Sequence, residues 1–540
     1  MSSTHRLLTA LVVGVLLLRG SDLLATGKFY VALSGDDNSD GRTPETAWQS
    51  VSRAAATAVA GDTIFIKAGH YRRERVVVKN SGTAEAPIVF QGYKDQPGDA
   101  PDPKYRPGDR LSPDVLPVLD GENAKAPGIQ CEGKSYIEFR RLGLTRFSTG
   151  IYSYKSQHIV LDSVLAVNLG SVGLNLLDCA HCTVRNCVVT DAGDDNIILL
   201  RTHNSVVENC KTYGVIFDPP PAAPDYYIVL CDGHDNVVRD CLSWNLHPEQ
   251  PVHPGHGIGI KDQARADGYP APHSCNNKII NCVARNNGES FFVAHEAHHN
   301  EFVNCTVLHQ WRTAKNRWNE GINIRDGAHD NVFRNCRVEG ARCGATIQDT
   351  VEGPKGPDGK PVAQICSGNV LANCVFTDAQ DAFEIWNAVD NQFRNCVVEN
   401  VEDVLVRFLE GKNQGTVLRN TIVANVRGAY LHADKSGGDV RFTYSNFWGN
   451  RFPPPDGVGN LAKDPLFADP AKKDFHLRSA EGRWDAASSC WVKDQQTSPC
   501  IDAGDPSDGC AAEPQPNGGR INIGAYGGTA EASKSRPRGG

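Results

Sequence analysis

The sequence predicts an all-β solenoid of short parallel strands, and three observations support this fold class. First, cysteines recur in one frame at steps of 23, 31, 41, 23, 31, 38 and 22 residues, each after an asparagine or aspartate. Second, alternating apolar and polar residues, as in 321–325, are typical of strands with one buried face. Third, no segment beyond about residue 65 shows a helical stripe, and a repeat of about 20–50 residues is typical of solenoids. The cysteines are Cys187, Cys210, Cys241, Cys282, Cys305, Cys336, Cys374 and Cys396.

A second column lies five residues before the cysteines and consists of asparagines. Stacked side-chain amides at a tight turn can bond one another from coil to coil, which satisfies buried polar groups. Extending the cysteine frame to Arg141, Ser163, Thr421 and Asn446 gives roughly eleven to twelve coils. The asparagines of this column are Asn236, Asn277, Asn300, Asn331, Asn369 and Asn391.

The chain divides into six segments. Residues 1–25 read as a secretory signal peptide, because His5 and Arg6 precede an apolar run, Leu7–Leu18, that is too short to span a bilayer. Residues 27–95 are expected to form an N-terminal cap with the first coils, including a helix near 50–59. The remaining segments are a surface loop (96–118), the parallel solenoid (119–450), a C-terminal capping segment (451–528) and a disordered tail (529–540).

The predicted signal peptide and the net charge limit the kinds of partner that this protein can have. The signal predicts a secreted, periplasmic or cell-surface protein with no membrane span after signal removal. The net charge of −8 disfavours nucleic acid and anionic membranes as partners, but it leaves room for an acidic sugar at a locally basic cleft. We expect a monomer.

The eighteen cysteines raise the question of disulfides. A residue that recurs once per coil stacks about 4.8 Å from its neighbours, and such a ladder usually packs as small buried apolar groups. We therefore expect disulfides outside the ladder, among Cys490, Cys500 and Cys510, with Cys343–Cys366 as a further pair.

Polar residues gather where one strand of each coil ends. Long insertions flank this strand, at 213–227, 244–257, 263–274, 309–320 and 351–366, and long loops on one face of a solenoid are typical of binding sites. The alternative is a solvated face whose charges neutralise one another. The substrate-binding candidates are Arg201, Asp232, His295 and Asp326 at strand exits, with Trp311, Arg312 and Arg317 in a loop suited to sugar stacking and carboxylate pairing.

The densest polar stretch is 253–262, a glycine-rich strand that ends in Lys261. It resembles the catalytic segment of polysaccharide lyase family 9, in the right-handed parallel β-helix (pectate-lyase-like) superfamily, and the superfamily resemblance covers about residues 27–450. The resemblance implies a right-handed parallel β-helix, a catalytic lysine at Lys261 and Ca²⁺ held by Asp191, Asp194 and Asp195. The last aspartate of the family's calcium motif falls on Ile198 here.

The preferred function is a secreted lyase that cleaves a uronic-acid polysaccharide by β-elimination. Elimination needs a base beside a carboxylate and cations that neutralise that carboxylate. We assign the base to Lys261, assisted by His256, and carboxylate binding to Arg325 or Arg201, with Glu296 as a further catalytic candidate.

Two alternatives remain open. One is a glycoside hydrolase that pairs Asp194 with Asp232 or Glu296. Its support is that Asp194-Asp195 and the Gly-His-Gly at 255–257 match two elements of polygalacturonase-like enzymes. The other is a non-catalytic carbohydrate-binding or structural solenoid at the cell surface.

Overall fold

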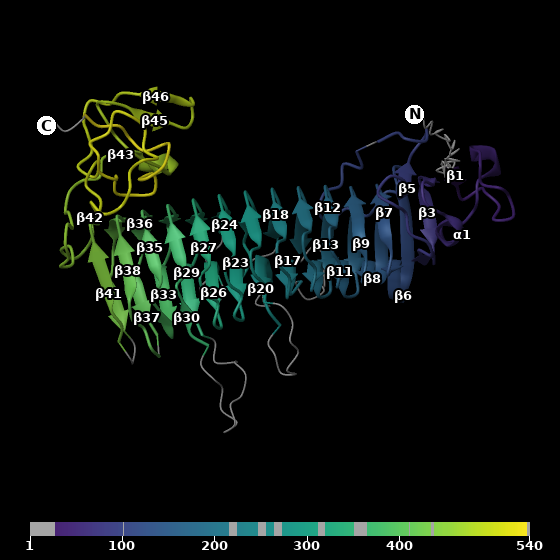
Figure 1. The fold of residues 1–540 in the computed structure, drawn as a ribbon, viewed down its shortest axis with the longest axis horizontal. Coiled ribbons are helices and arrows are strands. Elements are labelled where there is room, and N and C mark those ends of the chain that lie inside the picture. Colours follow the sequence, from purple (N-terminus) through teal and green to yellow (C-terminus); the bar gives the residue numbers. More distant parts are fainter. Residues whose placement is uncertain are drawn as a thin grey trace, which may run out of the picture.

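The computed structural model describes residues 27–100, 102–214, 224–246, 255–263, 273–310, 319–349, 364–409, 411–433 and 437–536. Its strands stack along one long axis into parallel sheets, with β1 (Lys28–Val31) near one end of the stack and β42 (Asn446–Trp448) near the other (Figure 1). This confirms the predicted parallel β-helix. No helix among the described residues is long and apolar enough to cross a membrane.

The first sheet runs the whole length of the solenoid and has 15 strands. All its pairs are parallel, and its central strands are only three residues long because each coil turns sharply at both ends. Its strands in order are β1 (Lys28–Val31), β2 (Thr63–Lys67), β5 (Ile88–Tyr93), β7 (Ser135–Arg140), β9 (Gln157–Asp162), β12 (Thr183–Arg185), β15 (Val206–Glu208), β18 (Val237–Arg239), β21 (Lys278–Ile280), β24 (Glu301–Val303), β27 (Val332–Arg334), β31 (Val370–Ala372), β35 (Gln392–Arg394), β38 (Thr416–Arg419) and β41 (Val440–Thr443).

The second sheet follows the first in each coil. Two long strands, β6 (Pro117–Glu132) and β8 (Gly143–Tyr154), take part in both the second and the third sheets. The other strands of the second sheet are β3 (Gly69–Arg72), β10 (Leu165–Leu169), β13 (Val188–Ala192), β16 (Lys211–Gly214), β19 (Leu242–Asn245), β22 (Val283–Arg285), β25 (Thr306–Leu308), β28 (Arg337–Glu339), β32 (Val375–Thr377), β36 (Val397–Val401), β39 (Ile422–Val426) and β42 (Asn446–Trp448).

The third sheet closes each coil and carries the polar strand ends that the sequence singles out. Its inward residues, such as Ile258 and Ile260, are fully buried in the solenoid core. Besides β6 and β8, its strands are β4 (Val76–Val77), β11 (Val172–Leu177), β14 (Asp195–Leu200), β17 (Tyr226–Cys231), β20 (His256–Lys261), β23 (Glu289–Ala294), β26 (Glu320–Arg325), β29 (Cys343–Gln348), β33 (Asp381–Trp386), β37 (Val406–Phe408) and β40 (Leu431–Ala433). A small parallel pair, β30 (Cys366–Ser367) and β34 (Ala388–Val389), lies at a nearby corner.

The N-terminal helix lies where the sequence predicts it. After the short 3₁₀ turn η1 (Pro44–Thr46), α1 (Val51–Thr57) begins at Ser50, whose side chain accepts a hydrogen bond from the Arg53 amide, as an N-cap serine does. Val51 and Ala54 are buried against the first strands, so the helix covers apolar surface at this end of the core.

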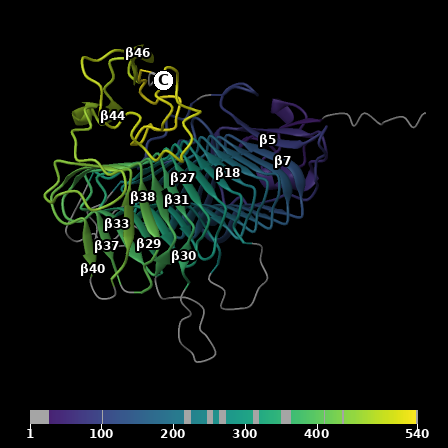
Figure 2. The ribbon, with the colours of Figure 1, turned by 60° about the vertical axis from the view of Figure 1, so that its left-hand side comes forward.

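The C-terminal segment packs beside the last coils (Figure 1 and Figure 2). Its apolar residues, including Phe475 and Ile523, form one buried cluster with Val397 and Ile422 of the second sheet. Asn373 Nδ2 donates to the carbonyl of Ala525, which ties the segment to the solenoid. Its elements are β43 (Phe467–Asp469), η2 (Pro470–Lys472), β44 (Asp474–Leu477), β45 (Arg483–Asp485) and β46 (Cys490–Val492).

The cysteine ladder is buried, as predicted, and its thiols bond to backbone carbonyls. Cys305 Sγ, for example, donates to the carbonyl of Ile279 in the preceding coil. The disulfides predicted among Cys490, Cys500 and Cys510, and between Cys343 and Cys366, are wrong, because all eighteen cysteines are free thiols.

The predicted extension of the ladder is also wrong by one residue near both ends. Arg141 and Ser163 have positive φ and align with Asn186, while Val164 takes the buried cysteine position. Beyond Cys396, Thr421 fits the column, but the next member is Ser445 and not Asn446.

The residue before each cysteine is asparagine or aspartate for a backbone reason. Asn186, Asp240 and Asn304 all have φ of 55°, the left-handed region that asparagine and aspartate tolerate best among residues with a side chain. Their side chains form an exposed ladder, in which Asn209 Nδ2 donates to Asn186 Oδ1 at 2.8 Å.

The second asparagine column forms the predicted amide ladder inside the solenoid. Asn300 Nδ2 donates to Asn331 Oδ1 at 3.1 Å and to the carbonyl of Ser274 at 2.9 Å. Asn300 Oδ1 accepts from the backbone and side-chain nitrogens of Asn277. The same bonds recur between successive members, so each buried amide satisfies groups in both adjacent coils.

Histidines line the corner between the third and first sheets. The rings of His158 and His181 stack at 5.1 Å between centroids, and those of His203 and His234 stack at 4.9 Å. Burial lowers the pKa of His158 and His203, and the adjacent histidines lower both further. Protonation therefore sets like charges in contact and costs stability.

This corner should make stability depend on pH. An unfolded histidine titrates near pH 6.5, whereas these pKa values are lower in the fold, so the unfolded chain binds more protons and stability falls as pH drops below about 6.5. Thermal melts at about pH 7 and about pH 5.5 measure the effect. A double variant, His158→Asn with His203→Asn, should show a smaller drop than the parent protein, and an equal drop would contradict this origin.

Candidate functional site

The candidate site lies on the outward face of the third sheet, where register brings distant residues together. Tyr226 pairs with His256, which pairs with Glu289 on the next strand. At the other end of the same strands Lys261 pairs with Ala294, and Ala294 pairs with Arg325. The face therefore carries an acid/base row at the strand starts and a cationic row at the strand ends.

Lys261 reaches back along its strand to Tyr226. Its Nζ donates to Tyr226 Oη at 3.0 Å and lies 4.2 Å from the centre of the tyrosine ring. Gly259 leaves room for the Phe292 ring of the next strand, because a Cβ there would lie 2.4 Å from that ring. Burial acts to lower the pKa of Lys261, but Tyr226, Cys231 and Asp225 outweigh it, so the pKa is raised and the ammonium stays charged.

His256 is held from three sides. Its ring stacks on Tyr226 with 4.8 Å between centroids, its Nδ1 lies 2.8 Å from Glu289 Oε2, and its Nε2 lies 3.8 Å from Asp225 Oδ1. The side chain is 9% exposed, and that of Glu289 is 3% exposed. A carboxylate at one ring nitrogen orients the imidazole and leaves the other nitrogen for proton transfer.

Arg325 completes the cationic row. Its Nε lies 3.4 Å from Glu289 Oε2, and its Nη1 donates to Asp326 Oδ2 at 3.3 Å. Burial disfavours its charge, but Glu289 and Asp326 raise its pKa. His295 lies 3.5 Å from Asp326, and burial lowers its pKa to about 4. His295 is therefore neutral at pH 7. Glu289 contacts both Arg325 and His256 and so connects the two.

Three aspartates oppose these cations at the start of β14 and β17. Burial, then the charge of Asp194, raises the pKa of Asp195 to about 7, while Lys261 acts against this shift. Burial and Asp225 also raise the pKa of Asp194. Asp195 Oδ1 is buried and has no hydrogen-bond partner among the described residues. A neighbouring cation would relieve this cluster.

The predicted calcium ligands are only partly together. Asp191 accepts a hydrogen bond from Thr190 Oγ1 at 2.8 Å and adds to the burial that raises the pKa of Tyr105 and Tyr227. Asp194 and Asp195 instead interact with Lys261. Within the described ranges, no three acidic, histidine or cysteine side chains are arranged to hold a metal ion, so the trio does not form a ready-made calcium shell.

Comparisons with known proteins agree with this fold. A family model described as a right handed beta helix region matches residues 127–268, and one described as disaggregatase related matches residues 381–504. A stretch of 237 residues, 42% of this chain, is 27% identical to pectate lyase PEL9 of Emericella nidulans and covers 51% of that protein. Together with the stacked parallel sheets, the match to the right handed beta helix model identifies the fold as a right-handed parallel β-helix.

Two further similarities accompany these matches. This β-helix protein is 37% identical over 67 residues to uncharacterized protein YwoF of Bacillus subtilis, which is 12% of this chain and 14% of YwoF. The solved PL6 family polysaccharide lyase Pedsa3628 from Pseudopedobacter saltans has a TM-score of 0.44 and 11% identity, covering 82% of this chain and 97% of that one. The β-helix thus matches about half, or less, of the lengths of its two curated relatives.

The other residues predicted for the site of this β-helix protein lie at strand ends and in turns, and one of them adjoins Lys261, because the Asp232 amide donates to the Lys261 carbonyl at 3.1 Å. Arg201 forms a two-pronged ion pair with Asp178, at 2.6 and 3.1 Å. Asp232 is buried at a strand exit, where it accepts a hydrogen bond from the Gln263 amide. Glu296 is exposed in a turn. The other three, Trp311, Arg312 and Arg317, lie outside the described residues.

The register also separates the carboxylates proposed for a hydrolase. Asp195 pairs with Tyr226 at the start of β17, whereas Asp232 follows the end of that strand, about 20 Å away at roughly 3.3 Å per residue. Asp194 and Asp232 therefore cannot flank one glycosidic bond.

Sequence reasoning missed Tyr226, Glu289 and Asp225. Tyr226 and Glu289 share the register position of His256, the first residue of its strand. The signal was available in principle, since aligning strand starts across coils puts Tyr226, His256 and Glu289 in one column. Insertions of different length before these strands hide that column in the linear sequence.

Proposed function

We propose that this protein is a secreted polysaccharide lyase that cleaves a uronic-acid polysaccharide by β-elimination. The observation that carries the proposal is the contact between the charged Lys261 ammonium and the Tyr226 hydroxyl, beside the His256–Glu289 pair. Cations, a base and a hydroxyl acid on one face of the sheet are the groups that elimination beside a carboxylate requires. The similarity to pectate lyase PEL9 over part of the chain supports the same reaction class.

Each group then has one role. Lys261 and Arg325 neutralise the uronate carboxylate, which acidifies the adjacent C–H bond. His256, oriented by Glu289, takes that proton as the C=C bond forms, and Tyr226 Oη gives a proton to the departing glycosidic oxygen as the C–O bond breaks. The sequence assigned the base to Lys261, but its raised pKa favours the charge-neutralising role.

The direct test is ultraviolet absorbance during incubation with a panel of uronic-acid polysaccharides. Elimination leaves an unsaturated sugar at each new chain end, so absorbance should rise with a pectic or alginate substrate. New reducing ends without any rise in absorbance would replace the lyase by a hydrolase. Neither signal across the panel would leave a non-catalytic carbohydrate-binding solenoid.

Calcium enters the proposal through Asp194 and Asp195. Two carboxylates, one with a buried oxygen that lacks a hydrogen-bond partner, supply part of the six to eight oxygens that Ca²⁺ prefers. A bound calcium ion would offset the acidic cluster and attract the substrate carboxylate.

The affinity for calcium should depend on pH. Because the pKa of Asp195 is about 7, a proton competes with the metal below that pH, and affinity should fall by up to tenfold per pH unit. Titration calorimetry of the metal-stripped protein between about pH 5.5 and about pH 8 measures this. Asp195→Asn should bind more weakly and with a smaller pH dependence, and absence of binding at about pH 8 would remove calcium from the proposal.

A hydrolase remains the second candidate because of Glu320. Burial, then Glu289, raises its pKa to about 7, and Arg342 lies 3.1 Å from Glu320 and 2.7 Å from Glu384. A carboxyl group that is half protonated at neutral pH is suited to general-acid catalysis. Glu320→Gln separates the two functions, since it removes this acid from a hydrolase and leaves the Lys261–Tyr226 contact of the lyase in place.

A further inference from the structure

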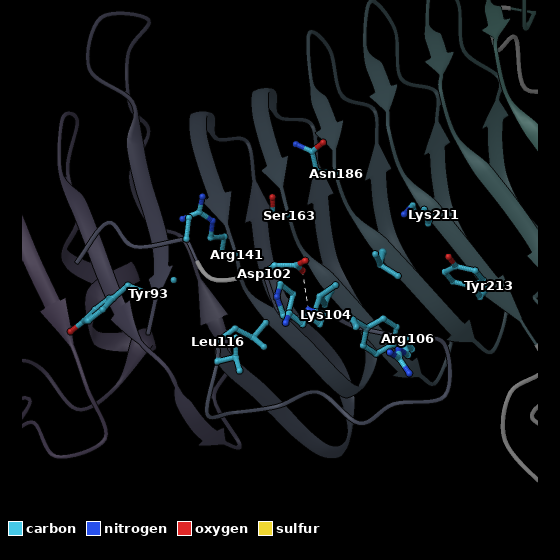
Figure 3. A pocket seen from close by; sticks show the side chains of 17 residues that line it. Tyr93, Asp102, Lys104, Arg106, Leu116, Arg141, Ser163, Asn186, Lys211 and Tyr213 are labelled. Atoms are coloured by element: carbon cyan, nitrogen blue, oxygen red, sulfur yellow. Dashed lines mark hydrogen bonds between the residues drawn. The ribbon is translucent and has the colours of Figure 1, made fainter. Parts of the chain in front are cut away.

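A hollow lies on a different face from the Lys261 cluster. The segment after Tyr93 folds over the second sheet near its corner with the first, and it encloses a cavity of about 760 Å³ (Figure 3). Ser163 and Asn186 line it at the corner, and Leu165 and Lys211 line it on the sheet. The volume falls in the range of about 300–1,000 Å³ that is typical of small-molecule sites.

The lining is strongly cationic. Lys104, Arg106, Arg141 and Lys211 contribute four positive charges, and Asp102 contributes one negative charge. Asp102 accepts a hydrogen bond from the backbone amide of Lys104 at 2.9 Å, and Arg141 Nη1 donates to the carbonyl of Asp99 at 2.7 Å. A positive hollow in a protein of net charge −8 selects an anion over a neutral ligand.

Aromatic side chains accompany the cations. Tyr93 and Tyr213 lie at opposite ends of the cavity in Figure 3, with Asp102 and Lys104 between them. Tyr105 also lines the cavity, and its hydroxyl is buried. Tyrosine rings pack against sugar C–H faces and their hydroxyls bond to sugar hydroxyls, which favours a carbohydrate over a compact inorganic anion.

The same chemistry continues along the second sheet. In register, Tyr213 pairs with Trp244, and Trp244 pairs with Arg285. The Tyr213 and Trp244 rings lie 6.3 Å apart, and the Arg285 guanidinium lies 4.6 Å from the Trp244 ring centre. An aromatic and cationic row that spans three successive coils suits a chain-like ligand that leaves the cavity along the solenoid.

We infer that this cavity and row bind a carboxylated sugar chain at a second site, separate from the Lys261 cluster. Arg141 and Lys211 pair with sugar carboxylates, and Tyr213 and Trp244 pack against sugar rings. The choice of ligand class rests on the proposed function. The location of the site does not, because it lies on the second sheet and the proposed catalytic groups lie on the third. The site anchors a polymer while another part of it is cleaved.

The test uses the full-length protein with Lys261→Met, so that substrate is bound but not cleaved. Arg141→Asn with Lys211→Thr removes both charges and suits the local backbone, because Arg141 has a φ of 56°, which asparagine tolerates. The probes are oligogalacturonate and oligomannuronate, with a neutral cello-oligosaccharide as control. Calorimetry and tryptophan fluorescence, to which Trp244 contributes, report binding.

The inference expects at least a tenfold loss of affinity for an acidic oligosaccharide in the double variant, with an unchanged melting temperature. In the protein that retains Lys261, the double variant should raise the KM for polymer but leave turnover of short oligosaccharides unchanged. Equal binding by parent and variant, equal binding of the neutral sugar, or displacement of the signal by inorganic phosphate alone would overturn it. If elimination is absent but charge-dependent binding persists, the proposed function fails and the second site stands.

Discussion

Replacing Lys261 by methionine should lower kcat/KM for a uronic-acid polysaccharide by about 10²–10⁴-fold. Methionine keeps much of the buried aliphatic chain but removes the ammonium that contacts Tyr226 Oη. Two effects add, since the substrate carboxylate loses a neutralising charge and the Tyr226 hydroxyl loses its partner. Initial rates of absorbance increase across a range of substrate concentrations measure the change.

Lys261→Arg distinguishes the two roles proposed for this residue. Arginine keeps the positive charge and cannot serve as a base, so a charge-neutralising role retains much of the activity and a base role does not. Lys278→Met is the matched control, because Lys278 is exposed on the first sheet, where it pairs with Glu301. Equal losses in Lys261→Met and Lys278→Met, or full activity in Lys261→Met, would contradict the assignment.

The fold was predictable because each coil repeats the same backbone problem. A left-handed residue at the corner selects asparagine, and the buried position after it selects a small apolar group such as cysteine, so both leave columns in the sequence. The asparagine–cysteine pattern is absent from coils in which other residues take these positions. Arg141 and Ser163 adopt the left-handed conformation at the corner, and Val164 occupies the buried position. The sequence frame slipped by one residue at these coils.

The site was predictable only where a strand carries its own signal. Glycines before Lys261 indicated a close approach, and the structure fills the space beside Gly259 with the Phe292 ring. Tyr226 and Glu289 have no such local pattern. Their proximity to His256 depends on pairing across coils with unequal insertions, which linear spacing does not encode.

The charge of the whole face explains why the acids and bases alternate. Arg325 lies between Glu289 and Asp326, and Arg342 lies between Glu320 and Glu384. Buried charges persist only when paired, so each added acid on this face requires a cation in an adjacent coil. Lys261 differs from these arginines because its ammonium donates to the neutral Tyr226 hydroxyl, which suits the proposed pairing with a substrate carboxylate.

Asn300→Ala should destabilise the protein by about 3 kcal/mol or more. The side chain of Asn300 is fully buried; its Nδ2 donates to Ser274 and Asn331, and its Oδ1 accepts from the backbone and side chain of Asn277. Alanine leaves several of these groups buried without partners, at about 1–3 kcal/mol each. Chemical denaturation followed by circular dichroism measures the shift in midpoint.

The matched control lies in the same coil. Asn304 belongs to the exposed ladder and has a φ of 55°, so Asn304→Gly keeps the backbone relaxed and should change stability by less than about 1 kcal/mol. The contrast separates an amide that satisfies buried groups in two adjacent coils from one chosen mainly for its backbone conformation. Solenoid coils are stabilised by contact with their neighbours, so the loss of one buried amide also weakens the coils that carry Lys261 and Arg325. Activity should therefore be lost at a lower denaturant concentration in Asn300→Ala than in Asn304→Gly. Similar midpoints for the two variants would show that the inner amides contribute little beyond their backbone geometry.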